Sequence, residues 1–156
     1  MGGYTSNNSQ SPQAKRRTTS IRGVDFASGG NAVEYGNLMS ANYSVYGSST
    51  GTTTRGFYFG GFAPDGSIDA VNVIQFITIA TTGNATNFGD LTLARSYVSG
   101  CSSHIRGVFG GGNTPSNVNN IDFVTIATTG NASDFGDLIE GRESLRATSN
   151  SHGGII

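Results

Sequence analysis

The chain repeats one sequence motif three times, and this repeat constrains the fold more than any other feature. Two copies are nearly identical, Thr78–Leu91 and Thr125–Leu138, and both read Thr-Thr-Gly-Asn-Ala followed two residues later by Phe-Gly-Asp-Leu. A more divergent copy spans Asp25–Leu38. Gly83 and Gly130 are 47 positions apart, which fits a period of about 50 residues. Self-similarity at this period indicates an array of small structural units.

The composition favours an all-β fold for these units. Glycine accounts for 24 of the 156 residues, 10% of the residues are aromatic, and the net charge is -1. A disordered chain usually combines a high net charge with few aromatic residues, and this chain has neither property. Short β-branched and aromatic runs between Gly-rich turns predict antiparallel strands. We expect strands over Ile21–Ala27, Met39–Ser49, Arg55–Gly61, Val73–Thr81, Tyr97–Ser103, Arg106–Gly112, Ile121–Ile126 and Leu145–Ser151, and no helix.

The repeat also sets the domain organisation. We interpret the chain as a single repeat domain over residues 1–156, with repeat one at 1–58, repeat two at 59–109 and repeat three at 110–156. Residues 4–20 are predicted to be an extended loop or a segment that a partner orders. The offset of 47 carries Arg106–Phe109 onto residues 153–156, and Met1–Gly3 supplies the glycines that should follow. The sequence therefore predicts one strand that is split between the two termini.

Eight positions recur in phase and are predicted to be structural: Gly83, Asn84, Phe88, Asp90, Gly130, Asn131, Phe135 and Asp137. Gly and Asn tolerate positive φ, so each Gly-Asn pair predicts a turn. The aromatic residue is expected to form a wedge between neighbouring units. We interpret each Asp as a hydrogen-bond acceptor at a turn or strand end, and not as half of an acid–base pair.

With these motifs, the chain resembles the kelch-like repeats of virion proteins from tailed bacteriophages. The resemblance covers nearly all of Ile21–Ile156, and its most specific parts are the Thr-Thr-Gly-Asn-Ala-x-x-Phe-Gly-Asp-Leu block and Arg106–Gly112. It implies the blades of a kelch-like β-propeller. The chain departs from ordinary kelch repeats because it has no tryptophan, and its first copy has Asn37 in place of Asp.

Three repeats are too few to close a propeller, which typically has four or more blades. We therefore expect a homo-oligomer in which another chain completes the ring. Two chains can form six blades if each completes the split strand of the other by β-augmentation. The alternative is a chain that closes on itself as a β-trefoil or a three-sheet β-prism, both of which are common among lectins.

No motif predicts catalysis, a cofactor or a metal site, so we expect a protein that is not an enzyme. His104 and His152 lack a second ligand at metal-binding spacing. Cys101 is the only cysteine, cannot form an internal disulfide, and is interpreted as a small buried residue. A net charge near zero gives no electrostatic argument for binding nucleic acid.

Four arginines are candidates for binding a partner: Arg16, Arg17, Arg55 and Arg106. The first two belong to a basic run that can bind an acidic partner or simply be solvated. Arg55 and Arg106 occur in phase, so they either form a charge pair or clamp a carbonyl within each unit, or they contribute to a ring of cations around a channel or acidic ligand. The loops at 4–20, 62–72 and 113–120 differ between repeats, and we expect partner or glycan contacts there.

The resemblance implies a structural virion protein in a tail, fibre, neck or head decoration. Such a protein contacts other virion proteins and can also recognise a glycan on the host surface. The N-terminus has no signal peptide and no run reaches transmembrane length, so we expect synthesis in the host cytoplasm, incorporation into the virion and no membrane insertion. The alternative function is a carbohydrate-binding lectin module with three quasi-equivalent sites.

Overall fold

The computed structural model describes residues 4–5, 16–25, 27–40, 49–63 and 69–149, and these residues form strands and no helix. The expectation of an all-β fold is therefore confirmed. The strands are β1 (Tyr4–Thr5), β2 (Arg16–Arg17), β3 (Ser20–Gly23), β4 (Val33–Asn37), β5 (Ser49–Gly51), β6 (Arg55–Phe59), β7 (Val73–Thr78), β8 (Thr86–Asp90), β9 (Ser99–Ser102), β10 (Arg106–Gly110), β11 (Asn120–Thr125) and β12 (Ser133–Asp137).

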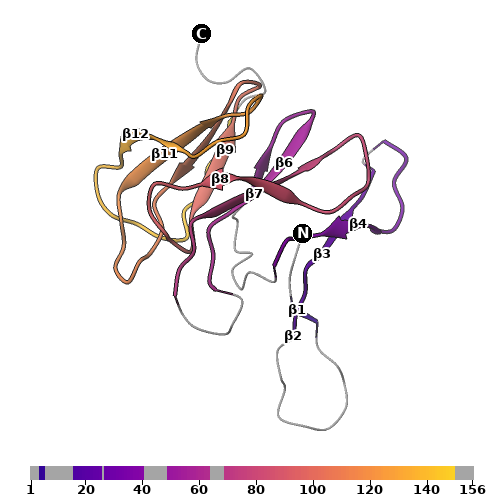
Figure 1. Ribbon diagram of the computed structural model, residues 1–156, viewed down its shortest axis with the longest axis horizontal. Coiled ribbons are helices and arrows are strands. Elements are labelled where there is room, and N and C mark those ends of the chain that lie inside the picture. The colour runs from indigo at the N-terminus through magenta and orange to yellow at the C-terminus, as the bar shows by residue number, and fades with distance from the viewer. Residues whose placement is uncertain (1–3, 6–15, 26, 41–48, 64–68, 150–156) are drawn as a thin grey trace, which may run out of the picture.

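Each strand pairs in antiparallel fashion with a neighbour in the chain (Figure 1). Two sheets have four strands, in the orders β5-β6-β7-β8 and β9-β10-β11-β12, while β3 pairs with β4 and β1 with β2. In Figure 1 the β9–β12 sheet lies on one side and the β3-β4 hairpin on the opposite side, with the β5–β8 sheet between them. The chain is thus an open series of sheets.

Three hairpins share one register, which is the structural counterpart of the sequence motif. In β3-β4, β7-β8 and β11-β12 the pairing shifts by one residue at the same place. The shifts fall at Ile21/Arg22, Ile74/Gln75 and Ile121/Asp122. The residue left unpaired opposite each shift is aromatic: Tyr35, Phe88 and Phe135. A β-bulge bends its strand and redirects a side chain, so it explains why an aromatic-Gly pair recurs here.

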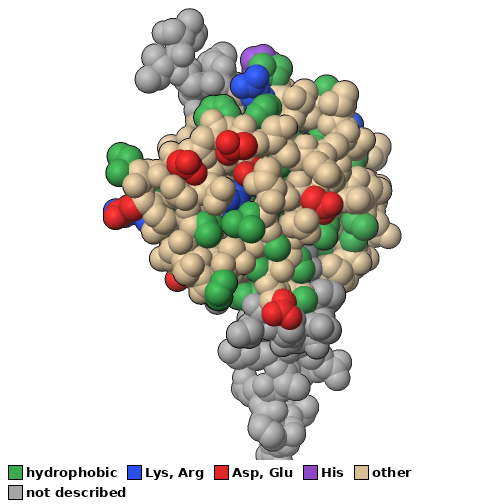
Figure 2. All heavy atoms as spheres, turned by 60° about the vertical axis from the view of Figure 1, so that its left-hand side comes forward, with side chains coloured by type: hydrophobic (Ala, Val, Ile, Leu, Met, Phe, Trp, Pro, Cys, Tyr) green, Lys and Arg blue, Asp and Glu red, His purple; other side chains and the backbone are tan. Residues whose placement is uncertain are grey.

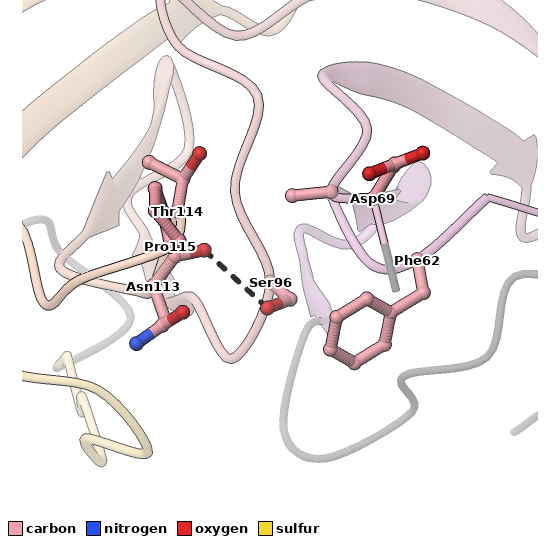
Figure 3. A pocket seen from close by; sticks show the side chains of 7 residues that line it. Phe62, Asp69, Ser96, Asn113, Thr114 and Pro115 are labelled. Atoms are coloured by element: carbon pink, nitrogen blue, oxygen red, sulfur yellow. Dashed lines mark hydrogen bonds between the residues drawn. The ribbon is translucent and has the colours of Figure 1, made fainter. Parts of the chain in front are cut away.

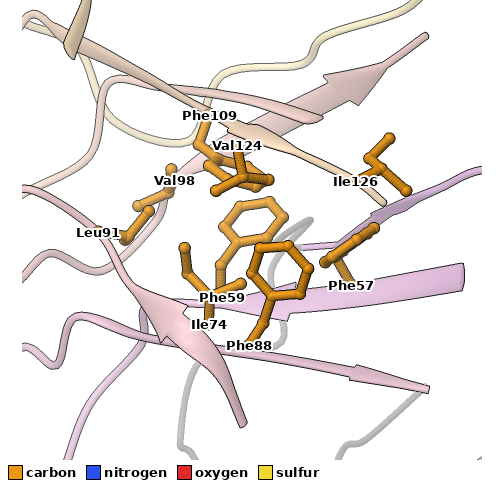
Figure 4. Close-up of a cluster of buried hydrophobic side chains, with 9 residues drawn as sticks. All are labelled: Phe57, Phe59, Ile74, Phe88, Leu91, Val98, Phe109, Val124 and Ile126. Carbon is orange, nitrogen blue, oxygen red and sulfur yellow. The ribbon is translucent and has the colours of Figure 1, made fainter. Parts of the chain in front are cut away.

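The main core joins the two four-stranded sheets (Figure 4). Its buried side chains are Phe57, Phe59, Ile74, Phe88, Leu91, Val98, Phe109, Val124 and Ile126. Phe57 and Phe59 lie on the same face of β6 because alternate residues of a strand point to the same side. The ring centroids of Phe59 and Phe109 are 4.3 Å apart, so aromatic packing directly links the two sheets.

A smaller core joins the β3-β4 hairpin to the β5–β8 sheet. It contains Ile21, Leu38 and Ala85, with Tyr35, Tyr58 and Ile77 packed against them. The equivalent register positions in the main core are occupied, in the same order, by Ile74, Leu91, Ala132, Phe88, Phe109 and Val124. We call the contact between the β3-β4 hairpin and the β5–β8 sheet the first junction, and the contact between the two four-stranded sheets the second junction. Both junctions are built from equivalent residues.

One ion pair is fully buried at the second junction. Arg95 Nη2 lies 2.9 Å from Asp122 Oδ2, and both side chains have an exposed fraction of 0%. Asp122 also accepts hydrogen bonds from the backbone N and the Oγ1 of Thr92, while Arg95 donates to the carbonyl oxygens of Asn120 and Phe109. Burial lowers the pKa of the Arg95 guanidinium, and the carboxylate of Asp122 opposes that shift.

Two of the expected strands differ from the structure. Residues 39–40 lie outside any strand, and β5 begins only at Ser49. Residues 145–149 also lie outside any strand, although Ser149 Oγ donates to the carbonyl of Ser102 on β9. Residues 41–48 and 150–151 lie outside the described residues, and so do Met1–Gly3 and 153–156, on which the prediction of a split strand rests.

Candidate functional site

Loops of repeats two and three enclose a pocket of about 370 Å³ (Figure 3). Its lining residues are Phe62, Asp69, Ala70, Ser96, Asn113, Thr114 and Pro115. In Figure 3, Phe62 and Asp69 lie on one side of the pocket, and Asn113, Thr114 and Pro115 lie on the other. Two of the three loops that were expected to carry contacts therefore come together at one site.

Backbone hydrogen bonds hold both sides of this pocket in place. The backbone N of Ser96 donates to the carbonyl of Asn113 at 3.1 Å, and the backbone N of Asn113 donates to the carbonyl of Ser96 at 2.9 Å. The side-chain amide of Asn113 donates to Asn117 Oδ1 at 3.0 Å. On the opposite side, the backbone N of Ala63 donates to the carbonyl of Asp69 at 2.8 Å. These hydrogen bonds fix the positions of the backbone segments that carry the polar groups of the pocket.

The pocket combines one aromatic ring with several hydrogen-bonding groups. Phe62 packs edge-to-face on Tyr97, with ring centroids 5.6 Å apart. The pocket is also lined by the carboxylate of Asp69, by Thr114 and by Ser96, whose hydroxyl donates to the carbonyl of Asn113 at 3.4 Å. A few well-placed polar groups beside an aromatic surface are typical of ligand sites. This arrangement suits a small ligand with an apolar face and several hydroxyl groups.

A second hollow of about 330 Å³ lies beside β5 and β9. It is lined by Gly51, Thr52, Thr53, Ser102, Ser103, His104 and Ser149. Ser102 Oγ donates to the carbonyl of Gly51, and Ser149 Oγ donates to the carbonyl of Ser102, so two of its hydroxyls already brace the backbone. These bonds favour a structural interpretation of the hollow.

The described residues contain no group of three or more His, Cys, Asp or Glu side chains that could hold a metal ion. Within the same residues, His104 is exposed and Cys101 is a half-buried free thiol. Among the described residues there is no helix that is long and apolar enough to cross a membrane.

The segment at Gly83 and Asn84 packs against β4, but neither residue has the positive φ that was expected of a turn there. The backbone N of Gly83 donates to the carbonyl of Tyr35 at 2.9 Å, and that of Ala85 donates to the carbonyl of Asn37 at 2.8 Å. Asn84 Oδ1 accepts a hydrogen bond from the backbone N of Asn37 at 3.0 Å. Three hydrogen bonds therefore hold this segment on the edge of β4.

The turn at Gly130 and Asn131 repeats this arrangement on β8. Gly130 N donates to the carbonyl of Phe88 and Ala132 N donates to the carbonyl of Asp90, both at 2.8 Å. Asn131 Oδ1 accepts from the backbone N of Asp90 at 3.1 Å. Six of the eight predicted positions therefore meet at the two junctions. The remaining two, Phe135 and Asp137, lie on β12, the outermost strand of its sheet.

The in-phase arginines stack on in-phase aromatic residues. The guanidinium carbon of Arg55 lies 4.6 Å from the centre of the Phe76 ring, and that of Arg106 lies 4.8 Å from the centre of Phe123. Arg55 Nη1 also donates to the carbonyl of Ile126. Arg55 thus contacts a carbonyl, but one that follows β11 of the other four-stranded sheet and not one within its own unit. The backbones of Arg16 and Arg17 form β2, and their side chains lie outside the described residues.

Sequence reasoning missed the Arg95–Asp122 ion pair. A signal was present, because Asp122 is a charged residue within the apolar run of β11. Gln75 occupies the same register position in β7, so a polar side chain recurs there. The identity of the partner could not be read from the sequence, since Arg95 lies in a loop before β9.

Comparison with known proteins adds no family. A scan against protein-family models finds no match for this chain. A search of the curated proteins likewise finds no match.

Proposed function

We propose that this protein is a structural component of a tailed bacteriophage virion, in the tail, a fibre, the neck or a head decoration. The observation that carries the proposal is the location of the motif residues. The Gly-Asn turns and the aromatic-Gly-Asp strands, on which the resemblance rests, are the residues that join one unit to the next. A motif whose residues form the contacts between units is suited to a protein whose role is assembly.

The proposed architecture is a set of β-propeller blades completed by another copy of the chain. β7 is flanked by β6 and β8, and β11 is flanked by β10 and β12, whereas β3 pairs with β4 alone within the described residues. The β3-β4 hairpin thus corresponds to half of a four-stranded blade. A second chain can supply the other half by β-augmentation, which would also protect the exposed edge of β3.

Incorporation into particles tests the virion proposal. Particles released by lysis of the producing cells are purified on a density gradient and labelled with a gold-conjugated antibody against the purified chain. We expect the protein to sediment with the particles and the label to decorate one location on them. A protein that remains entirely in the soluble fraction, while particles assemble normally, would contradict the proposal.

A carbohydrate-binding function is the second candidate, because the loop pocket combines an aromatic ring with hydroxyl, amide and carboxylate groups. Its test is a glycan array followed by competition with the free sugar. Phe62→Ala and Asn113→Ala are expected to abolish any binding through this pocket. Thr52→Ala, in the second hollow, is the control and should leave binding unchanged. Binding that is equally strong in all three variants would exclude the pocket as the glycan site.

A further inference from the structure

The two internal junctions use one docking geometry. We call the aromatic-Gly-Asp/Asn segment of β4 (35–37), β8 (88–90) and β12 (135–137) the acceptor edge, and the Gly-Asn-Ala segments at 30–32, 83–85 and 130–132 the donor turns. The donor turn at 83–85 docks on β4, and the one at 130–132 docks on β8. In each case two backbone N–H groups and one asparagine side chain make the same three hydrogen bonds.

The space beside the central glycine of each acceptor edge shows whether a donor turn is docked there. A Cβ built on Gly36 would lie 1.9 Å from the carbonyl oxygen of Gly83, and one on Gly89 would lie 2.2 Å from that of Gly130. A Cβ on Gly136 would meet no described atom within 4 Å. The acceptor edge on β12 therefore has the residues of a junction without the turn that fills it.

The apolar residues beside the acceptor edge on β12 are more exposed than their counterparts at the second junction. Phe135 has an exposed fraction of 54%, whereas its counterpart Phe88, which is covered by a docked turn, has 3%. Leu138 and Ile121, which occupy the positions of buried Leu91 and Ile74, are only half-buried. Figure 2 turns the β12 side of the molecule toward the viewer and shows apolar side chains scattered among uncharged polar ones, with several acidic groups and fewer basic ones.

The complementary surface lies at the other end of the molecule. The donor turn of repeat one, Gly30–Ala32, is exposed, and Ala32 stands at the position of Ala85, whose exposed fraction is 5%. Val24, at the register position of the packed residues Ile77 and Val124, has an exposed fraction of 50%. Because β12 and the β3-β4 hairpin lie on opposite sides of the molecule (Figure 1), this turn cannot reach the open edge of its own chain.

We infer that the acceptor edge on β12 binds the donor turn of a second copy of this chain. Gly30 has a φ of 111°, whereas Gly83 and Gly130 have no positive φ, so the segment would have to adopt their conformation on docking. The backbone N of Gly30 would then donate to the carbonyl of Phe135, that of Ala32 to the carbonyl of Asp137, and Asp137 N to Asn31 Oδ1. Val24 and Ala32 then cover Phe135. The contact is heterologous, since opposite ends of two copies meet. This inference rests on the proposed assembly role of the protein. Self-association of the chain can nevertheless be tested in the absence of virus particles.

The charged residues at the two ends are compatible with this docking. Arg22 Nε lies 3.6 Å from Glu34 Oε2 beside the donor turn, and Arg142 pairs with Glu140 beside the acceptor edge. Arg22 holds the register position of Asp122 in its hairpin, and Arg142 follows Leu138 as Arg95 follows Leu91, so docking in the internal geometry would place two cations where the second junction has an ion pair. Glu34 and Glu140 already pair with these two arginines and would supply the counter-charges at the contact. Association should therefore depend on the salt concentration.

The test is the solution mass of the full chain, measured by light scattering after size exclusion over a series of concentrations. We expect a mass that is a multiple of 16.1 kDa and that falls toward 16.1 kDa on dilution. Ala32→Glu in the donor turn, or Phe135→Ser in the acceptor edge, should weaken association by roughly 100-fold or more, because each leaves a polar group at a buried apolar position. Ile105→Ser is the matched control, since Ile105 has a similar exposed fraction of 56% and lies outside both surfaces.

Mixing the two variants gives the sharper result. Ala32→Glu keeps an intact acceptor edge and Phe135→Ser keeps an intact donor turn, so an equimolar mixture should form a heterodimer through one normal contact. Circular dichroism verifies that each variant is folded. A wild-type chain that is monomeric at every concentration would overturn the inference, as would variants that associate like wild type or fail to complement each other. Association in solution without incorporation into particles would refute the virion proposal alone.

Discussion

Replacing Asp122 with asparagine should lower the free energy of unfolding by about 3–5 kcal/mol, the usual cost of removing one member of a buried ion pair. The substitution keeps the side-chain shape and one oxygen for Thr92, but it leaves the Arg95 cation without its counter-charge. Both side chains are fully buried, and Arg95 Nε already has no hydrogen-bond partner. Since a domain of this kind is stabilised by about 5–15 kcal/mol, the loss is a large fraction of the total.

Urea unfolding followed by far-ultraviolet circular dichroism measures this loss. With a denaturant slope of about 2 kcal/mol per molar, the midpoint should fall by roughly 2 M. Glu140→Gln is the exposed control, because Glu140 and Arg142 are each 61% exposed and such pairs contribute less than about 1 kcal/mol. The control should therefore leave the midpoint nearly unchanged.

A neutral replacement separates the charge from the packing. At the first junction Gln75 Oε1 accepts a hydrogen bond from the backbone N of Met39 at 2.8 Å, as Asp122 does from Thr92. The sequence places Asn42 four residues after Leu38, where Arg95 follows Leu91. The double variant Arg95→Asn/Asp122→Gln should therefore be more stable than Asp122→Asn alone. The reasoning is refuted if Asp122→Asn unfolds within about 1 kcal/mol of wild type, or if the double variant is the less stable of the two.

Three further outcomes follow from the junctions. Gly89→Ala should destabilise the chain by about 1–3 kcal/mol in thermal unfolding, because the new Cβ would lie 2.2 Å from the Gly130 carbonyl oxygen; the same change at Gly136, where space is open, should cost less. Phe57→Ala should cost about 3–5 kcal/mol in urea unfolding, since the ring has an exposed fraction of 0%. Burial raises the pKa of Tyr58 above 10.0, so folding favours its protonated form. Its contribution to stability is therefore retained below pH 10.0 and declines as the pH rises through the raised pKa, and Tyr58→Phe should flatten the alkaline part of a stability–pH profile.

Much of the local structure was predictable because it depends on short-range rules. The alternation of Phe57 and Phe59 follows from strand geometry. The positive φ that was expected at the Gly-Asn pairs occurs instead at Gly89 and Gly136, and the turns lie at 79–80 and 126–127. The repeat also indicated which positions are equivalent. It did not reveal the β-bulge at Phe88, because a bulge is defined by the partner strand as well as by its own sequence.

The loop pocket and the buried ion pair could not be predicted, because both depend on segments that are far apart in the sequence. Phe62 and Asn113 belong to loops of different repeats, and only the packing of the two sheets brings them to one site. Arg95 is a loop residue, and an isolated arginine is usually exposed. Its burial depends on an acceptor set from β10 and β11 that no local pattern specifies.

The close approach at Gly36 and Gly89 has a consequence for stoichiometry. A contact that joins opposite ends of two molecules is not saturated by one partner, so the rotation between successive units decides whether copies close into a ring or continue as a filament. That rotation is set where backbones touch without an intervening side chain. Longer loops leave it unaltered, whereas one added methyl group at either glycine changes it. If copies join by the contact inferred above, the number of subunits depends on this rotation, and an alanine at Gly36 or Gly89 should change the size of the assembly as well as its stability.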